Sequence, residues 1–321
     1  MERTGALAAK SLTAEAIRTL CGLDILDAHK LDHVEGVTTP DRLYPYRVVF
    51  LDRFSDSLCG ELESAPEPGV LVIATSDYRR RIPQARIITD SPRKVFARVV
   101  WELFDYLGDV QTERVHPTAK VHLTARLSVG VTVGAGGEIG EGAYLCPNVV
   151  VGPNVRIGKG CIIKAGTVIG QPGFGVYRDA NGDPYHLPHV GGVFIGDHVE
   201  LGALNTVASG TIHPTVIEDM VKTDDHVHIA HNCHVGARTL VAACAEMSGS
   251  VVVGRDCWIG PNAAIRDGIE IGTGAFIAIA SNVVHPVGAG ETVLGNPARS
   301  VVNGGDRGRP RTRPGGTGRA R

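Results

Sequence analysis

An aliphatic residue returns at every sixth position along most of the chain. The series begins at Val115, breaks after Ile169, resumes at Ile195, and after a second slip near residues 213–216 runs from Ile217 to Val283. The remaining members are Val121, Leu127, Val133, Ile139, Leu145, Val151, Ile157, Ile163, Leu201, Val207, Thr223, Ile229, Val235, Val241, Met247, Val253, Ile259, Ile265, Ile271 and Ile277, and Thr223 alone departs from the apolar type. A six-residue period matches neither the 3.6-residue turn of an α-helix nor a heptad. It predicts a mainly β protein, built as a parallel β-helix.

Small residues support the same architecture. Glycine follows the aliphatic at several repeats, for example at Gly140, Gly158, Gly236 and Gly272. Such residues allow the backbone to turn sharply and let neighbouring coils approach. We therefore expect each hexad to form one short strand and one corner, and three hexads to close an 18-residue coil. The coils are expected to stack as in other solenoids, each contacting only its neighbours.

The first 110 residues lack this period and predict a small α/β domain, to which we assign acceptor binding. Its expected elements are a helix over 12–20, strands over 47–51, 70–74 and 86–89, and a helix that begins at Ser91-Pro92. The expected domains are thus 1–110, a β-helix over 111–302, and a tail over 303–321. The tail is rich in Arg, Gly and Pro and is expected to be disordered.

Composition narrows the class of protein. Lys plus Arg (32) and Asp plus Glu (34) nearly cancel, so the net charge does not indicate a nucleic-acid partner. No apolar run reaches the roughly 18 residues needed to span a bilayer, and the first residues do not form a signal segment. The seven cysteines are scattered, without a C-x-x-C pair, as is usual for small core residues in a reducing compartment. We expect a cytoplasmic protein with no stable membrane insertion.

Four histidines lie within nine residues: His226, His228, His231 and His234. Ile229 is expected to face the interior of the coil, so His231, two residues later, lies outside it. One coil is eighteen residues, which places Gly249 beside His231. A neutral imidazole accepts a proton at physiological pH, and a backbone N–H stabilises an oxyanion, so this pair suits acyl transfer.

In the acyl-transfer interpretation, Asp224 or Asp225 would orient the His231 ring by a hydrogen bond. Two other interpretations of the histidine cluster remain open. The histidines would otherwise line a contact between subunits. The second is zinc, because γ-class carbonic anhydrases use a similar β-helix and hold zinc with three histidines, two of them five residues apart. His226 and His231 have that separation, with His189 earlier in the chain.

The interruption between Ile169 and Ile195 is a second candidate for function. It contains Gly173-Phe174-Gly175 and ends near His189. A long loop that leaves a rigid scaffold is often a binding element, although a simple surface excursion is the alternative.

Three motifs carry a family resemblance: Val168-Ile169-Gly170 with Gly173-Phe174-Gly175, His228-Ile229-Ala230-His231-Asn232, and Ala245-Glu246-Met247-Ser248-Gly249-Ser250. Together they resemble the UDP-3-O-acylglucosamine N-acyltransferase family over about residues 95–285. The resemblance implies a left-handed β-helix, a homotrimer with sites between subunits, and a role in lipid A biosynthesis or a similar pathway. It also implies that His231 is catalytic, with Asp224 as its acidic partner and Gly249 in the oxyanion hole. We expect substrate contacts from Gly173, Phe174, Gly175, His228, Asn232 and Ser248.

The chain also departs from that family. Gly268 stands where the family has a second histidine, and residues 51–55 and 208–210 differ from its uracil-binding and Asp-Arg-Gly segments. The ending at residues 295–299 looks like that of CoA-dependent hexapeptide acetyltransferases. We therefore expect N-acylation of an amine, an amino sugar or a nucleotide-linked amino sugar, by the phosphopantetheine thioester of acyl-CoA or acyl carrier protein. No bound cofactor or metal is expected. O-acylation, a zinc hydratase and a non-catalytic trimeric scaffold remain the alternatives.

Overall fold

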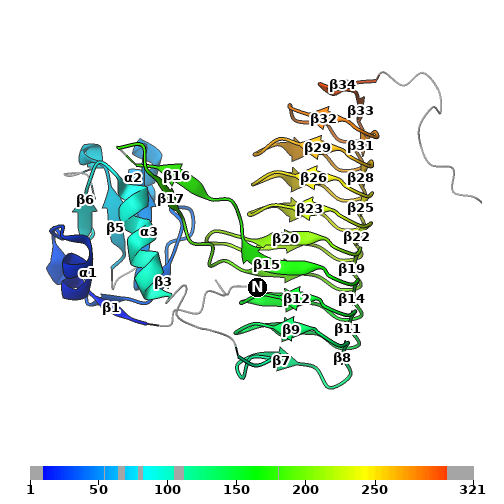
Figure 1. Cartoon of the computed structure of the whole chain (residues 1–321). Coiled ribbons are helices and arrows are strands. Elements are labelled where there is room, and N and C mark those ends of the chain that lie inside the picture. The colour runs from blue at the N-terminus through cyan, green and yellow to red at the C-terminus, as the bar shows by residue number, and fades with distance from the viewer. Residues whose placement is uncertain are drawn as a thin grey trace, which may run out of the picture.

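The computed structural model describes residues 10–53, 55–63, 69–78, 82–104, 112–179 and 181–301. The expected tail over 303–321 and the expected boundary near residue 110 lie outside these residues. Among the described residues, no helix is long and apolar enough to cross a membrane. Figure 1 shows an N-terminal α/β part beside a tall stack of short strands.

The N-terminal part is built on a parallel sheet in the order β3-β4-β5-β6, and a small antiparallel pair, β1 and β2, lies apart from it. The helix expected over 12–20 begins at Ala14, because Leu12 and Thr13 pair with β2 and the Thr13 side chain accepts a hydrogen bond from the Ala16 N–H. The elements are β1 (Leu12–Thr13), α1 (Ala14–Cys21), a 3-10 turn (Ala28–Lys30), β2 (His33–Val34), β3 (Gly36–Val37), β4 (Arg47–Leu51), α2 (Asp56–Glu63), β5 (Leu71–Ala74), a second 3-10 turn (Ser76–Tyr78), β6 (Arg86–Ile88) and α3 (Pro92–Leu103).

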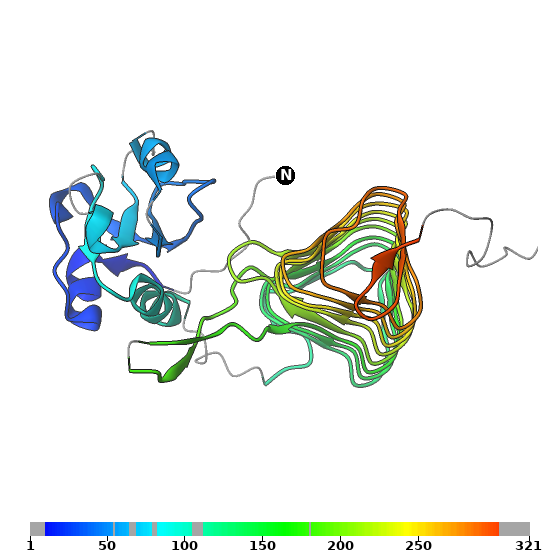
Figure 2. The ribbon, with the colours of Figure 1, turned by 90° about the horizontal axis from the view of Figure 1, so that it is seen from above.

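The remainder of the described chain winds into a three-sided solenoid, whose triangular outline is visible in Figure 2. The first side consists of β7 (Lys120–Val121), β10 (Glu138–Ile139), β13 (Val155–Ile157), β18 (Val193–Ile195), β21 (Thr215–Ile217), β24 (His234–Val235), β27 (Val252–Val253) and β30 (Glu270–Ile271). The second consists of β8 (Arg126–Leu127), β11 (Tyr144–Leu145), β14 (Ile162–Ile163), β19 (Glu200–Leu201), β22 (Lys222–Thr223), β25 (Leu240–Val241), β28 (Trp258–Ile259), β31 (Phe276–Ile277), β33 (Thr292–Leu294) and the antiparallel β34 (Arg299–Ser300). The third consists of β9 (Thr132–Val133), β12 (Val150–Val151), β15 (Val168–Pro172), β20 (Thr206–Ser209), β23 (His228–Ile229), β26 (Glu246–Met247), β29 (Ala264–Ile265) and β32 (Asn282–Val283). The parallel β-helix of hexapeptide repeats predicted from the sequence is confirmed.

Thr223 is the one polar residue in the six-residue aliphatic series, and contacts inside the solenoid account for it. The aliphatics of the repeat stack in a continuous buried core. Thr223 is also buried, and its Oγ1 accepts hydrogen bonds from the Gly202 N–H (3.0 Å) and from the side-chain amide of Asn205. Asn205 in turn accepts from the Val227 N–H at 2.7 Å. A hydroxyl replaces an aliphatic here because it satisfies buried polar groups of the adjoining coil.

The long insert forms a hairpin that reaches back to the N-terminal part. The pairing of β15 with β20 shifts register after Ile169, where the insert leaves the solenoid. The hairpin strands are β16 (Val176–Arg178) and β17 (Pro184–His186). Leu187, Val190 and Ile212 join the hydrophobic cluster that includes α3. The insert thus packs against the N-terminal part instead of projecting into solvent.

Two polar contacts secure the same junction. Lys94 on α3 is ion-paired with Asp179 of the hairpin. Thr39 Oγ1 lies 2.7 Å from Nε2 of His213, in the loop where the repeat slips a second time. Both interruptions of the hexad series therefore serve as contact points for the N-terminal part.

Candidate active site

His231 lies outside the third side of the solenoid, next to the following coil. Ile229, at the end of β23, is buried in the bore and pairs with Met247 of β26. His231 lies two residues after Ile229, and Gly249 lies two residues after Met247. A Cβ atom added to Gly249 would lie 2.7 Å from Cε1 and 2.9 Å from Nε2 of the His231 ring. Only glycine leaves room for the imidazole, and the two residues adjoin as the 18-residue period predicts.

The other sides of the His231 ring are enclosed by the insert. A Cβ on Gly173 would lie 2.8 Å from Cδ2 of His231, so a second glycine is also needed. The ring of His189 meets the ring of His231 edge-on, with centroids 5.0 Å apart and an interplanar angle of 65°. The imidazole therefore stands in a narrow slot between two glycine backbones and a buried histidine.

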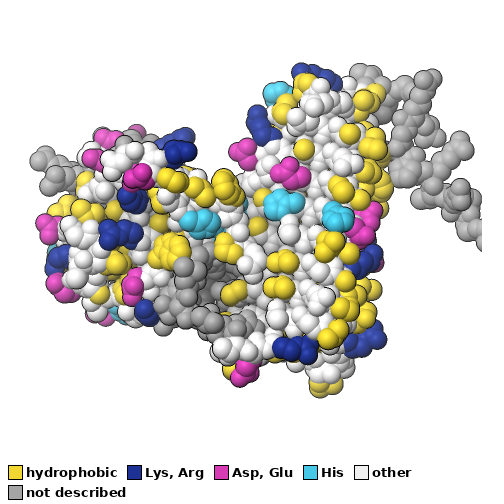
Figure 3. Space-filling model, in the orientation of Figure 1, with side chains coloured by type: hydrophobic (Ala, Val, Ile, Leu, Met, Phe, Trp, Pro, Cys, Tyr) yellow, Lys and Arg dark blue, Asp and Glu magenta, His cyan; other side chains and the backbone are white. Residues whose placement is uncertain are grey.

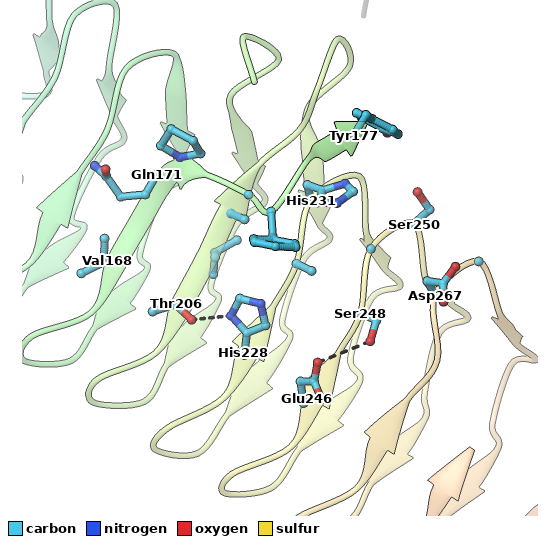
Figure 4. A pocket seen from close by; sticks show the side chains of 18 residues that line it. Val168, Gln171, Tyr177, Thr206, His228, His231, Glu246, Ser248, Ser250 and Asp267 are labelled. Atoms are coloured by element: carbon cyan, nitrogen blue, oxygen red, sulfur yellow. Dashed lines mark hydrogen bonds between the residues drawn. The ribbon is translucent and has the colours of Figure 1, made fainter. Parts of the chain in front are cut away.

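This slot opens onto a cleft of about 1030 Å³. Figure 3 shows the corresponding face, with histidine side chains exposed at mid-height of the solenoid, and Figure 4 shows the cleft from close by. Six of the predicted site residues line it: Gly173, Phe174, His228, His231, Ser248 and Gly249. Phe174 is 86% exposed, so its ring is free to contact a bound molecule.

The surroundings of His231 keep its ring uncharged at neutral pH. Burial, and secondarily the nearby His228, lower the pKa of His231. His228 Nδ1 itself lies 2.6 Å from Thr206 Oγ1. Because only the neutral ring has a free lone pair, a lowered pKa suits a proton acceptor.

His189 is a residue that the sequence pointed to only as a metal ligand. It is 5% exposed, and burial lowers its pKa to about 4, with smaller contributions from His231 and His186. A Cβ on Gly175 would lie 2.5 Å from its Cε1 atom, so Gly175 makes room for His189 and does not itself line the cleft. Among the described residues, no group of three or more His, Cys, Asp or Glu side chains is arranged to hold a metal ion.

Asp224, predicted as the acidic partner of His231, lies on a different side of the solenoid. It follows β22 on the second side of the triangle, whereas His231 follows β23 on the third. Its Oδ1 accepts a hydrogen bond from the Asp225 N–H at 2.9 Å, and Asp225 Oδ1 accepts from the Ala203 N–H at 2.7 Å. Within one chain, neither carboxylate is brought to the His231 ring.

Asn232 is not among the residues that line this cleft, and its side chain bonds to Thr211 and His231. Its φ is +60°, a left-handed corner conformation that asparagine tolerates well. Its Oδ1 accepts from the Thr211 N–H at 2.8 Å, and its Nδ2 lies 3.1 Å from Thr211 Oγ1 and 3.1 Å from His231 Nδ1. Its backbone N–H donates to Thr215 Oγ1 at 3.0 Å. Asn232 is therefore the residue that contacts Nδ1 of His231.

Two carboxylates in the cleft were missed from the sequence. Glu246 lies eighteen residues after His228, and Asp267 lies eighteen residues after Gly249, so the coil period would have found both. Glu246 accepts a hydrogen bond from the Ser248 hydroxyl at 3.3 Å. They make this side of the cleft acidic.

A second cleft of about 580 Å³ lies where the N-terminal part meets the insert. Tyr177 lines both clefts, and Asn232 also borders the second. The Arg93 guanidinium is stacked 4.1 Å from the centroid of the Tyr177 ring and 5.5 Å from that of Phe50. The two clefts therefore adjoin through the hairpin.

Comparison with known proteins finds sequence similarity to acyltransferases over part of the chain. The family model for the bacterial transferase hexapeptide (six repeats) matches residues 136–171 and 250–278. The chain is 40% identical over 123 residues to a UDP-3-O-acylglucosamine N-acyltransferase of Herminiimonas arsenicoxydans. This match covers 36% of this chain and 35% of that protein. It is 41% identical over 139 residues to the enzyme of the same name from Caulobacter sp. (strain K31), which covers 43% and 41%. The resemblance inferred from the sequence is confirmed.

The extent of the similarity is limited. The chain matches about two fifths or less of the length of these curated relatives. A solved UDP-N-acetylglucosamine acyltransferase of Francisella novicida is 25% identical, with a TM-score of 0.49 over 58% of this chain and 69% of that one.

Proposed function

We propose that this chain is an N-acyltransferase that moves an acyl group from a phosphopantetheine thioester to the amine of a nucleotide-linked amino sugar. The observation that carries the proposal is the His231 ring held against Gly249 at the edge of the large cleft. The similarity to UDP-3-O-acylglucosamine N-acyltransferases supports the choice of acceptor.

In this proposal His231 moves the proton and Gly249 stabilises negative charge. The amine nitrogen attacks the thioester carbon, its proton passes to His231, and the carbonyl oxygen becomes an oxyanion that the Gly249 N–H stabilises. The C–S bond then breaks, the amide forms, and the thiolate sulfur receives the proton from His231. The lowered pKa of His231 keeps the ring neutral before the reaction, so the ring can accept the proton once a nitrogen lone pair faces the amine.

We further propose that the two clefts hold different parts of the reactants. The large cleft, with Phe174, His228 and Ser248 in its wall, receives the reacting amine and the thioester. The smaller cleft receives the rest of the acceptor, because Tyr177 joins it to the first and Arg53 and His213 supply polar contacts. The N-terminal part thus acts as an acceptor-binding domain, and acyl-CoA or acyl carrier protein is the donor.

We propose a homotrimer as the working form. Several outward-facing side chains of the solenoid are large and apolar, including Ile162 and Leu240 on the second side and Phe194 and Val252 on the first. Such groups on adjacent faces suit packing against further copies. We propose that in this assembly Asp224 of one copy contacts His231 of a neighbouring copy, since within one chain the two residues follow strands on different sides of the solenoid. Size-exclusion chromatography with light scattering should give three times the chain mass, and a monomeric mass would contradict the assembly.

The activity is tested by intact-mass analysis of reactions that combine acyl-CoAs or acyl carrier proteins with amino-sugar nucleotides. Wild type should add one acyl group to the amine, and His231→Ala should lose about 10² to 10⁴ in rate while melting normally. His234→Ala is the matched control, since His234 is exposed on the first side and paired with Glu218. No transfer from any donor, or a His231→Ala rate near that of wild type, would contradict the proposal; transfer only to hydroxyl acceptors would indicate an O-acyltransferase.

A further inference from the structure

We infer that Asn232 is a positioning residue that sets the tautomer of His231, so that the resting neutral ring carries its hydrogen on Nε2 and presents an N–H to the cleft. The inference rests on the proposed function only in taking His231 as the reacting ring. The tautomer is defined by which nitrogen of the His231 ring, Nδ1 or Nε2, carries the hydrogen. Three hydrogen bonds of the Asn232 side chain determine it.

The orientation of the Asn232 amide is fixed by a group that can only donate. The backbone N–H of Thr211 points at Asn232 Oδ1 from 2.8 Å. Turning the amide over would place its NH₂ group against this N–H, and two donors cannot bond. Oδ1 therefore faces Thr211, and Nδ2 occupies the other position.

The two hydrogens of Nδ2 then have two acceptors. Thr211 Oγ1 lies 3.1 Å from Nδ2, and His231 Nδ1 also lies 3.1 Å from it. Because Nδ2 has no lone pair to offer, Nδ1 of the ring must accept, and a neutral imidazole that accepts at Nδ1 carries its hydrogen on Nε2. Rotating the ring by half a turn would put a carbon against Nδ2 and lose the bond.

The consequence concerns the nitrogen that faces the substrate. Nε2 is the ring nitrogen beside Gly249, at the wall of the cleft. With its hydrogen in place, Nε2 donates and does not accept. Before it can take a proton from an amine, the ring hydrogen must move to Nδ1 and the bond from Asn232 must be given up. In the protein without substrates, Asn232 thus disfavours the tautomer of His231 that has a lone pair on Nε2.

Replacing Asn232 by aspartate reverses this arrangement with almost no change in shape. One carboxylate oxygen still accepts from the Thr211 N–H, and the other accepts from Nδ1–H of the ring, as in other carboxylate–histidine pairs. The ring hydrogen moves to Nδ1, the lone pair moves to Nε2, and the negative charge stabilises the protonated ring. The pKa of His231 should therefore rise by about 1 to 3 units.

The experiment is ¹⁵N solid-state NMR of protein labelled at histidine only, without substrates. The His231 signals are assigned by their loss in His231→Gln, and the two ring nitrogens are distinguished by their couplings to the ring carbons. Wild type should show the N–H at Nε2; Asn232→Asp should show it at Nδ1 and a higher titration midpoint. Asn262→Asp is the matched control, because Asn262 has the corresponding left-handed corner position on another side of the solenoid, with φ +54°.

Wild-type protein with its hydrogen on Nδ1 would overturn the inference, as would an Asn232→Asp protein that keeps the wild-type tautomer and midpoint. Neither the tautomer nor the titration midpoint requires an acyl donor or an amine substrate to be present. A tautomer that differs from this one leaves the acyl transfer proposal standing, whereas the expected tautomer in a protein without transferase activity would contradict the proposed function alone.

Discussion

The imidazole of His231 lies so close to Gly249 that a single added methyl group at residue 249 would come within 2.7 Å of the ring. The two residues are eighteen positions apart, one full coil of the solenoid. The rigid stacking of coils thus places the His231 ring, and the absence of a side chain at Gly249, one coil away, provides the space for it.

Gly249→Ala should reduce the turnover number far more than it reduces stability. Its Cβ forces the His231 ring out of the slot, and misplacement of a reacting group by about 1 Å costs on the order of 10² in rate. Steady-state kinetics together with thermal melting measure both effects. Gly60→Ala is the control, since Gly60 lies in α2 and an added Cβ would have no atom within 4 Å apart from its chain neighbours and the helix backbone. Unchanged turnover in Gly249→Ala would show that the slot does not position the ring.

The activity should fall as pH is lowered through the pKa of His231, because only the neutral ring accepts a proton. That pKa lies below the ordinary value of 6.5, owing to burial and to His228. Replacing His228 by Gln should move the acid limb of the kcat/KM profile to higher pH, since one of the two influences that lower the pKa of His231 is removed. His234→Gln, on another side of the solenoid, should leave the limb in place. An acid limb above pH 6.5 in wild type would contradict the assignment.

His189 should make the protein sensitive to mild acid. Its pKa is about 4 in the folded protein and about 6.5 when unfolded, so the unfolded chain binds the proton more readily. The stability that it contributes is complete above pH 6.5 and is lost as pH falls toward 4, at most roughly 3 kcal/mol. Chemical denaturation at pH 7 and pH 4.5 measures the difference. His189→Gln should show a smaller loss, and an equal loss in both proteins would exclude His189 as its source.

Thr223→Val should destabilise the solenoid although it restores the apolar pattern. Valine has nearly the shape of threonine, but it leaves the Gly202 N–H and the Asn205 amide without their acceptor in a buried site. The cost is about 1 to 3 kcal/mol for each group left unsatisfied. Denaturant unfolding measures it, and Thr223→Ser, which keeps the hydroxyl, should recover part of the loss. A more stable valine variant would show that the buried network is dispensable.

Much of the N-terminal part was predictable because its elements have strong local signals. The strands at β4, β5 and β6 are runs of branched and aromatic residues, and Pro92 marks the start of α3. Ser91 precedes that helix, but its side chain makes no capping hydrogen bond. Helix α2 and the hairpin β16–β17 were not predicted, because both are short and largely polar and are stabilised by contacts with distant segments.

The solenoid and the adjacency of His231 and Gly249 follow from the periodicity of the chain alone. A strict six-residue period allows one way of burying its aliphatics, and the length of the coil then fixes which residues are neighbours. The groups on the remaining sides of the His231 ring are placed by long-range packing, which the periodicity does not specify. His189 and Gly173 arrive from an insert with no period, held in place by the N-terminal part, and the Asn232 bond to Nδ1 depends on Thr211 in a loop where the repeat slips. Periodicity specifies contacts between coils, whereas segments that leave the repeat are placed only by the surfaces on which they pack.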